Sequence, residues 1–360
     1  MQVNSSQMLD SDSTTSDSLE SDSSSGGAVD GVRFDEVDLA LIEALQINPR
    51  APWARIGAAL DMSASTAARR WERLTDAGLA WVTAYHDPTQ SVVAYLELQC
   101  RPADLEPLIG HLTELPWVFS VEQVAGDFDL FLGVVATDPP ALARAIGDLA
   151  ALPAPARAVT TRMCLHLYRE GSDWLVRTLD RDQRTTLDPA TTHRDQGPAA
   201  GADEELLRAL SEDGRRSFTE LSAITGIAEP TARRRVQRML RRDEITLRCD
   251  FAQHLAGWPL VVTYRMNVPS AQLDTAGRTL ARHPDVRLCA SVTGRCNLLL
   301  STWARSNDEG AHFESSLGQL IPGLQVLERT VTLRTVKRMG RQLLGPGGTA
   351  TGHVPIGLHV

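Results

Sequence analysis

The sequence predicts an α+β protein in which one module of helices and strands occurs twice. Three observations support this prediction. First, the chain resembles itself: Leu41 matches Leu206 at an offset of 165 residues, and the offset becomes 168 further on. Second, each copy begins with three short stretches of helical periodicity, and third, each continues with patterns in the order βαββαβ. The copies span about residues 34–169 and 202–338.

The third stretch of helical periodicity in each copy has an apolar face and a polar face. In copy one, Ala67, Trp71 and Leu74 follow one another at i, i+4 and i+7 and predict one buried stripe. Ser and Thr residues at its start suit a helix N-cap, and Arg residues occupy the opposite face. The first two stretches, at 37–45 and 53–60, supply the other two helices of a helix-turn-helix domain.

The polar face of the third helix predicts binding to double-stranded DNA. Short polar side chains near the start of a recognition helix approach base edges, and arginines further along bind guanine or phosphate. An arginine-rich face is also typical of a solvated surface, but the same three-helix context in both copies favours DNA binding. The predicted DNA-binding residues are Ser63, Ser65, Thr66, Arg69, Arg70 and Arg73 in copy one, and Thr231, Arg234, Arg235, Arg238 and Arg241 in copy two.

The segment after the third helix predicts a short β-hairpin in each copy, at 81–86 and 245–251. The βαββαβ order that follows is the ferredoxin-like arrangement, whose uncovered sheet face needs a partner that the other copy supplies. The predicted fold class is therefore two copies of a winged helix-turn-helix domain followed by a ferredoxin-like βαββαβ domain. The predicted organisation is a tail at 1–32, helix-turn-helix domains at 33–87 and 202–252, sensor domains at 88–169 and 253–338, a linker at 170–201 and a C-terminal tail at 339–360.

The net charge of −9 is unevenly distributed along the chain. Residues 1–30 contain six acidic side chains and no Lys or Arg, so this part is predicted to be a disordered acidic tail. Arginines cluster at 69–73 and 233–242, and such local patches are what DNA senses at short range. The five cysteines have no zinc-site spacing, and no apolar run approaches the ~18 residues of a membrane span. No metal site, cofactor or membrane contact is predicted, and the expected location is the cytoplasm.

The order of three helices and βαββαβ, with Gly126-Asp127-Phe128-Asp129 at the central hairpin, resembles the Lrp/AsnC (feast/famine) family of transcriptional regulators. The run at 63–74 is similar to that family's recognition helix. The resemblance covers nearly the whole of both copies, although most members carry one module and dimerise. It implies DNA binding, sensing of an amino acid or similar metabolite, and a ligand site between paired sensor domains near the turn.

The residues of this turn suit an amino acid chemically. A glycine lets a ligand approach the backbone, free N–H groups hold a carboxylate, and an aspartate holds an amino group. A plain hairpin turn is the alternative interpretation. Copy two carries Gly294-Arg295-Cys296-Asn297 instead. Because both acids are replaced and a cation is introduced, the second turn is expected to be structural only or to favour an anionic ligand.

Enzyme classes are disfavoured because the sequence has no phosphate-binding loop, dinucleotide fingerprint, zinc-protease motif or serine-hydrolase motif, and no catalytic residue is predicted. One alternative is a sirohaem decarboxylase-like enzyme, since some two-module proteins of this architecture have that activity and are expected to use an Arg-His pair after the hairpin. The corresponding stretches have no adjacent Arg and read Tyr85-His86-Asp87 and Gln253-His254-Leu255. A sensor that has lost DNA binding is a third class, which the Thr/Arg pattern of both helices disfavours.

The sequence thus predicts a one-component regulator that binds double-stranded DNA and a small-molecule effector. The two sensor domains are expected to pair within the chain, and association of several chains is left open. Copy one keeps the acidic turn, whereas copy two has the more basic third helix. This difference predicts that the first module contributes more to sensing and the second more to DNA anchoring, on an imperfectly palindromic operator.

Overall fold

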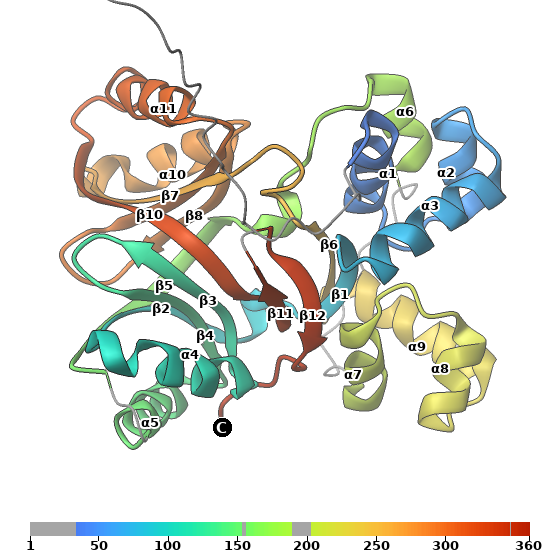
Figure 1. Ribbon diagram of the computed structural model, residues 1–360, viewed down its shortest axis with the longest axis horizontal. Helices are drawn as coiled ribbons and strands as arrows, with labels where there is room; N and C mark the ends of the chain where they lie inside the picture. The colour runs from blue at the N-terminus through green and yellow to red at the C-terminus, as the bar shows by residue number, and fades with distance from the viewer. Residues whose placement is uncertain (1–33, 153–155, 189–202, 346) are drawn as a thin grey trace, which may run out of the picture. The chain divides into compact units, whose positions relative to one another are not determined.

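The structure is a computed structural model that describes residues 34–152, 156–188, 203–345 and 347–360 (Figure 1). The predicted acidic tail at 1–32 lies outside the described residues. Each copy contains three helices followed by βαββαβ, so the predicted fold class is confirmed. None of the helices in the described part of the chain has the length and apolar character needed to cross a membrane.

The two copies have the same order of elements. Copy one contains α1 (Glu36–Ile47), α2 (Trp53–Ala59), α3 (Ala64–Asp76), β1 (Ala80–His86), β2 (Val92–Gln99), α4 (Leu105–Glu114), β3 (Val118–Ala125), β4 (Leu130–Ala136), α5 (Pro139–Ala150) and β5 (Ala158–Arg169). Copy two contains α7 (Glu204–Glu212), α8 (Phe218–Thr225), α9 (Glu229–Arg241), β6 (Ile245–Phe251), β7 (Leu260–Asn267), α10 (Leu273–Ala281), β8 (Val286–Val292), β9 (Leu298–Ala304), α11 (Asn307–Leu320) and β10 (Gln325–Arg338).

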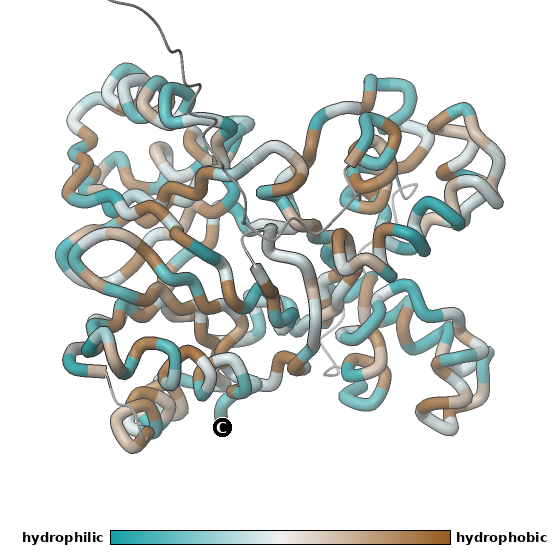
Figure 2. Tube along the Cα trace, viewed as in Figure 1, coloured by the Kyte–Doolittle hydropathy of each residue, from teal (hydrophilic) through white to brown (hydrophobic). Residues whose placement is uncertain are grey.

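Side-chain caps fix the starts of the helix-turn-helix elements. Asp35 and Asp38 form a reciprocal capping box at the start of α1, and the Ser63 hydroxyl accepts a hydrogen bond from the Thr66 N–H at the start of α3. The predicted apolar stripe of α3 is buried, and so is its counterpart on α9. Hydrophilic and hydrophobic residues alternate along these helices (Figure 2), as expected for helices that bury one face.

The strands of the two sensor domains form one closed sheet. β5 of copy one pairs with β8 of copy two, and β10 pairs with both β3 and β7. The closed sheet therefore consists of β3, β4, β2, β5, β8, β9, β7 and β10, with each strand bonded to the next. The expected pairing of the sensor domains within the chain is confirmed. Its cause is the uncovered face of each sheet, because an apolar cluster that includes Tyr95, Phe131 and Leu299 packs between the two copies.

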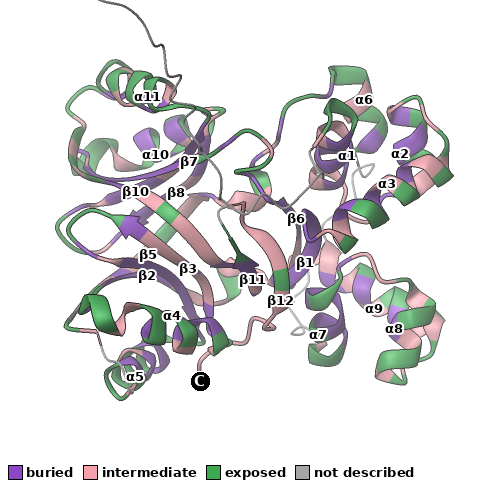
Figure 3. Cartoon of the chain, in the orientation of Figure 1, coloured by how far each residue is buried: buried purple, intermediate pink, exposed green. Residues whose placement is uncertain are grey.

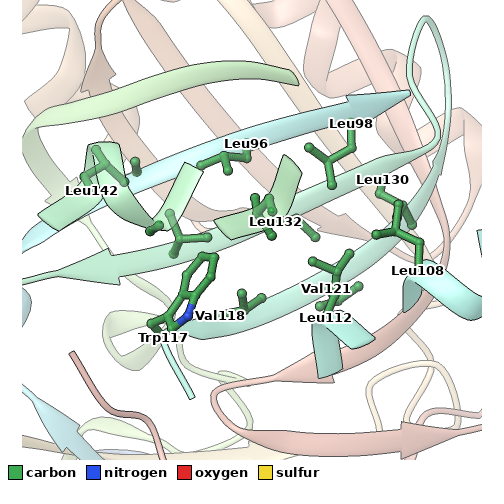
Figure 4. Packing of buried hydrophobic residues seen from close by; sticks show 14 of the residues in the cluster. Leu96, Leu98, Leu108, Leu112, Trp117, Val118, Val121, Leu130, Leu132 and Leu142 are labelled. Atoms are coloured by element: carbon green, nitrogen blue, oxygen red, sulfur yellow. The ribbon is translucent and has the colours of Figure 1, made fainter. Parts of the chain in front are cut away.

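The opposite face of each sensor sheet packs against its own helices. In copy one, Leu96 and Leu98 of β2 lie with Leu130 and Leu132 of β4 over α4 and α5 (Figure 4). These side chains alternate along the strands with those that face the other copy, as the two-residue period of a strand requires. Each sheet is therefore buried on both faces, and this holds the connecting turns in fixed positions.

The prediction of a hairpin after the third helix of each copy is wrong. Each copy supplies one strand, and β1 pairs antiparallel with β6 over its whole length, from Ala80 opposite Phe251 to His86 opposite Ile245. We call this two-stranded element the β1–β6 ribbon. Both strands are largely buried (Figure 3). The sequence indicates that each segment forms a strand, but it does not indicate which strand is its partner. In the structure, the partner is the equivalent strand of the other copy.

The structure also differs from the prediction of a linker at 170–201. Residues 171–187 contain η3 (Gly171–Asp173) and α6 (Arg181–Leu187), and Trp174 and Leu187 are buried. The fully buried carboxylate of Glu43 on α1 accepts hydrogen bonds from the backbone N–H of Leu179, at 3.0 Å, and from Arg184. The segment was predicted to be a linker because most of its residues are polar. Its few apolar residues are scattered through the sequence, but most of those at 171–187 are buried and hold the segment in place.

The C-terminal segment is ordered rather than a loose tail. β11 (Arg341–Leu344) and β12 (Thr349–His353) form an antiparallel pair that continues from β10. The Ala350 N–H donates to the Gly78 carbonyl at 2.8 Å, at the end of the first helix-turn-helix domain. We call β11 and β12 the C-terminal hairpin.

Candidate DNA-binding and effector sites

The start of α3 carries the predicted short polar residues. The Ser63 hydroxyl lies 2.9 Å from the Ser65 hydroxyl and 2.8 Å from the Thr66 hydroxyl. Arg69 follows one turn later and is exposed. The capped first turn and the exposed guanidinium form a polar surface of the kind that contacts a DNA groove.

Arg70 and Arg73 are held by α1. Arg70 Nη1 lies 2.9 Å from Asp38 Oδ1, and Arg73 Nη2 lies 2.5 Å from Asp38 Oδ2. Asp38 is fully buried, and these two cations are its ion-pair partners. Both arginines were predicted to contact DNA, and the structure shows that their ion pairs with Asp38 fix α3 against α1.

Arginines of α9 are also paired with acids, one at the start of α7 and one that follows α9 itself. Arg235 Nη1 lies 2.6 Å from Asp203 Oδ2, and Arg238 Nη2 lies 3.2 Å from the buried Glu244 Oε2. Arg234, the counterpart of Arg69, is exposed. Of the remaining predicted residues, Thr231 lies in the first turn of the helix and Arg241 is half-buried in its last turn.

A reciprocal pair of arginines joins the two helix-turn-helix domains. Arg50 of copy one donates to the carbonyl of Gly214 at 2.6 Å. Its counterpart Arg215 donates to the carbonyl of Pro49 at 2.6 Å. The Arg215 guanidinium also lies over the Trp53 ring, 3.9 Å from its centroid. Burial, followed by repulsion from Arg50, lowers the pKa of Arg215 to about 10.

Arg50 and Arg215 are equivalent positions of the repeat, at the offset of 165 residues, but the sequence predicted no role for them. Their identity at equivalent positions is a signal that points to a contact across a two-fold axis. The two recognition helices therefore belong to one interlocked pair of domains.

The predicted effector turn lies between β3 and β4 and faces the last strand of the other copy. A Cβ atom on Gly126 would lie 2.5 Å from Cγ2 of Thr330 on β10, so only glycine fits there. Asp127 is exposed, whereas Phe128 is buried beneath the guanidinium of Arg265. These contacts place the turn at the boundary between the two copies.

Asp129 has a structural role that explains its replacement in copy two. Asp129 Oδ2 accepts a hydrogen bond from the Cys100 N–H at 2.8 Å. In copy two, Asn297 Oδ1 accepts the equivalent hydrogen bond from the Val268 N–H at 3.0 Å. An amide oxygen accepts a backbone hydrogen bond as a carboxylate oxygen does. The replacement of Asp by Asn therefore leaves the second turn intact.

The second turn faces a basic residue. A Cβ atom on Gly294 would lie 2.9 Å from Nη1 of Arg162 on β5, and the adjoining Arg295 adds a second cation. Cys296, in the position of Phe128, is buried. The two turns therefore present opposite charges to a ligand.

A buried charge cluster lies between the two turns. Glu97 accepts two hydrogen bonds from Arg162, at 2.9 and 3.0 Å, and one from Arg265 at 2.5 Å. Arg265 Nη2 and Glu328 Oε1 are buried without a hydrogen-bond partner among the described residues. Burial raises the pKa of Glu328, and the nearby charges of Glu97 and Asp127 raise it further.

Comparison with known protein families settles the lineage of this architecture. The model of the AsnC-type helix-turn-helix domain matches residues 34–75 and 202–240. The model of the Lrp/AsnC ligand binding domain matches residues 93–172 and 261–342. The chain belongs to the Lrp/AsnC family. Each model matches once in each copy, and neither matching model is that of an enzyme.

Two transcriptional regulators are similar to about one module of this chain over most of their own length. The chain is 30% identical over 142 residues to an uncharacterized HTH-type transcriptional regulator of Pyrococcus abyssi, which covers 38% of this chain and 87% of the relative. It is 26% identical over 144 residues to the HTH-type transcriptional regulator Ptr1 of Methanocaldococcus jannaschii, covering 38% of this chain and 96% of the relative. As an Lrp/AsnC protein with two helix-turn-helix domains, the chain is a transcriptional regulator that binds DNA.

A solved structure shares the whole two-module fold. The siroheme decarboxylase NirDL, in complex with an iron-uroporphyrin III analogue, aligns with a TM-score of 0.56 at 13% identity. The alignment covers 85% of this chain and 93% of that chain. At this identity the likeness concerns the fold alone.

Proposed function

We propose that this Lrp/AsnC protein is a cytoplasmic, sequence-specific DNA-binding regulator that responds to an amino acid or a related small metabolite. The interlocked pair of recognition helices carries this proposal. Arg69 and Arg234 occupy equivalent exposed positions on α3 and α9. Four of the arginines around them are paired with buried or partly buried acids, which holds each helix in place: Arg70, Arg73, Arg235 and Arg238. The exposed pair is therefore available for base contact.

The geometry of the pair favours an operator with two half-sites. Two recognition helices related by a pseudo-two-fold axis enter successive major grooves about one helical turn apart or a multiple of it, roughly 34 Å. Because the helices differ in sequence, the half-sites differ too. The second helix is the richer in arginine and contributes more phosphate contacts.

The proposal is tested with Arg69→Ala and Arg234→Ala. Each substitution is expected to weaken specific binding by about 1–3 kcal/mol and to relax base preference in one half-site. Affinity is measured by fluorescence anisotropy on selected operators over a range of salt concentrations. The matched control is Arg278→Ala on α10, where the arginine is exposed and paired with Asp274. Unchanged affinity and base preference in both recognition-helix variants would contradict the assignment.

The first turn supports the proposal of an amino-acid effector. Asp127 and Glu328 place two carboxylates beside Gly126, and the second of them lacks a hydrogen-bond partner on Oε1. An ammonium group supplies the missing charge, and backbone N–H groups of the turn hold a carboxylate. We assign the effector to Gly126, Asp127 and the facing strand β10, with Phe128 and Asp129 as residues that support the turn.

A further inference from the structure

A cavity of about 140 Å³ lies at the junction of the closed sheet and the β1–β6 ribbon. Residues from all eight strands of the closed sheet and from both strands of the ribbon line it. We call it the central cavity. Its apolar wall combines aliphatic side chains with aromatic ones, which include Tyr95, Phe119, Phe131 and Trp303. Of the described residues that line it, none belongs to the turns at 126–129 or 294–297.

Three buried arginines from three strands line the central cavity: Arg248 of β6, Arg287 of β8 and Arg338 of β10. Two of them share one fully buried carboxylate, since Arg248 Nε lies 2.6 Å from Asp250 Oδ2 and Arg287 Nη2 lies 2.5 Å from Asp250 Oδ1. Arg338 instead donates to neutral oxygens, including Gln253 Oε1 at 2.8 Å. The three arginines therefore have more N–H donors than the single carboxylate of Asp250 can accept.

Two further acids line the cavity but are engaged elsewhere. Glu170 accepts a hydrogen bond from the Tyr85 hydroxyl at 3.1 Å, and burial raises the pKa of Glu170, which favours its uncharged form. Glu122 accepts a hydrogen bond from the Thr332 hydroxyl at 2.7 Å. Among the described contacts, neither acid is hydrogen-bonded to a cavity arginine.

Arg287 has a terminal nitrogen that no hydrogen bond within the described part of the chain uses. Its Nη1 is buried and has no hydrogen-bond partner among the described residues. The guanidinium is held in place by the Trp303 ring, 3.6 Å from the ring centroid. Burial and the nearby Arg248 lower the pKa of Arg287, which means that its charge is poorly compensated. A buried, charged donor without a partner is unfavourable, and a bound carboxylate corrects this.

We propose that the central cavity binds a small organic carboxylate, whose anion contacts Arg287 and whose apolar body lies against the apolar wall of aliphatic and aromatic side chains. Its volume of about 140 Å³ sets the size of the body. An apolar cavity of about 150 Å³ holds one benzene ring, so the ligand carries a single ring or a short branched chain. This site is separate from the amino-acid site at Gly126 and is distinguished from it by charge.

The position of the cavity gives the ligand a regulatory role. Tyr85 and Arg248 line it from the ribbon that follows the recognition helices, whereas Arg287 and Arg338 line it from the closed sheet. A carboxylate between them favours one placement of the ribbon on the sheet. Ligand binding is thereby coupled to the arrangement of the two helix-turn-helix domains, and so to operator affinity.

The test is calorimetric titration of the full chain with benzoate and isovalerate, with benzamide as an uncharged analogue of benzoate. At least one of the two anions is expected to bind, and benzamide is expected to bind at least tenfold more weakly than benzoate. The variant Arg287→Gln is expected to lose at least tenfold in affinity for the anion. The surface variant Arg278→Gln is the matched control and is expected to bind as the wild type does.

Two further variants keep the result decisive. Val93→Phe fills the cavity without removing an arginine and is expected to abolish binding, even where Arg287→Gln does not fold. Asp127→Asn lies outside the cavity and is expected to leave anion affinity unchanged. The proposal is overturned if neither anion binds the wild type, if benzamide equals benzoate, if a folded cavity variant binds normally, or if Asp127→Asn abolishes binding.

Discussion

Single residues make the two sensor domains unequal. Glu97 of copy one corresponds to Arg265 of copy two at the offset of 168, and the two side chains form an ion pair at 2.5 Å. In a dimer of identical modules, equivalent positions near the two-fold axis carry the same charge and repel each other. Fusion of the modules in one chain removes this constraint. As a result, the first turn faces the acidic Glu328 and the second faces Arg162.

The difference in charge between the two turns predicts that an amino-acid effector binds at the first turn and not at the second. In thermal-shift measurements with the common amino acids, at least one is expected to raise the melting temperature of the wild type. Asp127→Asn is expected to weaken that ligand by roughly 1.5–3 kcal/mol, because a charge-assisted hydrogen bond to its ammonium group is lost. Arg295→Gln in the second turn is the matched control and is expected to keep the response. Equal losses in both variants would contradict an assignment to the first turn.

Among the structural elements, the C-terminal hairpin has the least expected position. It joins β10 to both helix-turn-helix domains: Ala350 bonds to Gly78 of the first, and the Arg341 guanidinium donates to the carbonyl of Glu212 in the second. His353 of β12 lies in this contact. Burial, followed by repulsion from Arg341, lowers the pKa of His353 to about 4.

This pKa predicts acid sensitivity of the hairpin. The ordinary pKa of histidine is 6.5, so as the pH falls from 6.5 towards 4 the unfolded chain binds a proton that the folded chain does not. Stability is therefore lost in this window and is unaffected above it. Urea unfolding at pH 7 and pH 5 should show that His353→Gln avoids about 1–2 kcal/mol of the loss seen in the wild type. The variant of the exposed His312, His312→Gln, serves as the control; a loss in His353→Gln as large as in the wild type would refute the prediction.

The whole molecule is a pseudo-symmetric dimer within one chain. The closed sheet, the β1–β6 ribbon and the Arg50–Arg215 exchange each combine equivalent parts of the two copies. Two recognition helices in one chain bind an operator as a linked pair, so the second half-site is bound at a high effective concentration. The affinity of the whole operator then depends on how firmly the two domains are held together.

Removal of the reciprocal Arg50 and Arg215 hydrogen bonds should separate two contributions to operator affinity. One is the fixed position of the two domains, and the other is the contact that each recognition helix makes by itself. Arg50→Ala and Arg215→Ala are expected to reduce affinity for the full operator by about tenfold or more, because the helices lose their fixed relative position. Affinity for an isolated half-site is expected to stay within about twofold, as neither arginine lies on a recognition helix. Both affinities are measured by anisotropy, with the exposed-residue variant Arg208→Ala on α7 as the control. A parallel loss on the half-site would mean that these arginines support only the fold.

The local features of the site were predictable where they depend on neighbouring residues in the sequence. The buried stripe of α3, its Ser63 cap and the turn at Gly126 all follow from short-range periodicity and turn chemistry. The split roles of the arginines were not predictable. Arg69 and Arg70 are adjacent and chemically identical, and only the position of α1 decides that Arg70 binds Asp38 while Arg69 stays exposed.

The sequence by itself determined the repeat, the three-helix and βαββαβ order of each copy, and the loss of acids in the second turn, because these are properties of local pattern and residue type. Only the tertiary structure decided which strands pair across the copies, that Trp174 and the C-terminal hairpin are anchored, and that Arg248, Arg287 and Arg338 surround one cavity. These features join residues far apart in the chain. Their positions are set by the closure of the shared sheet, which no local pattern encodes.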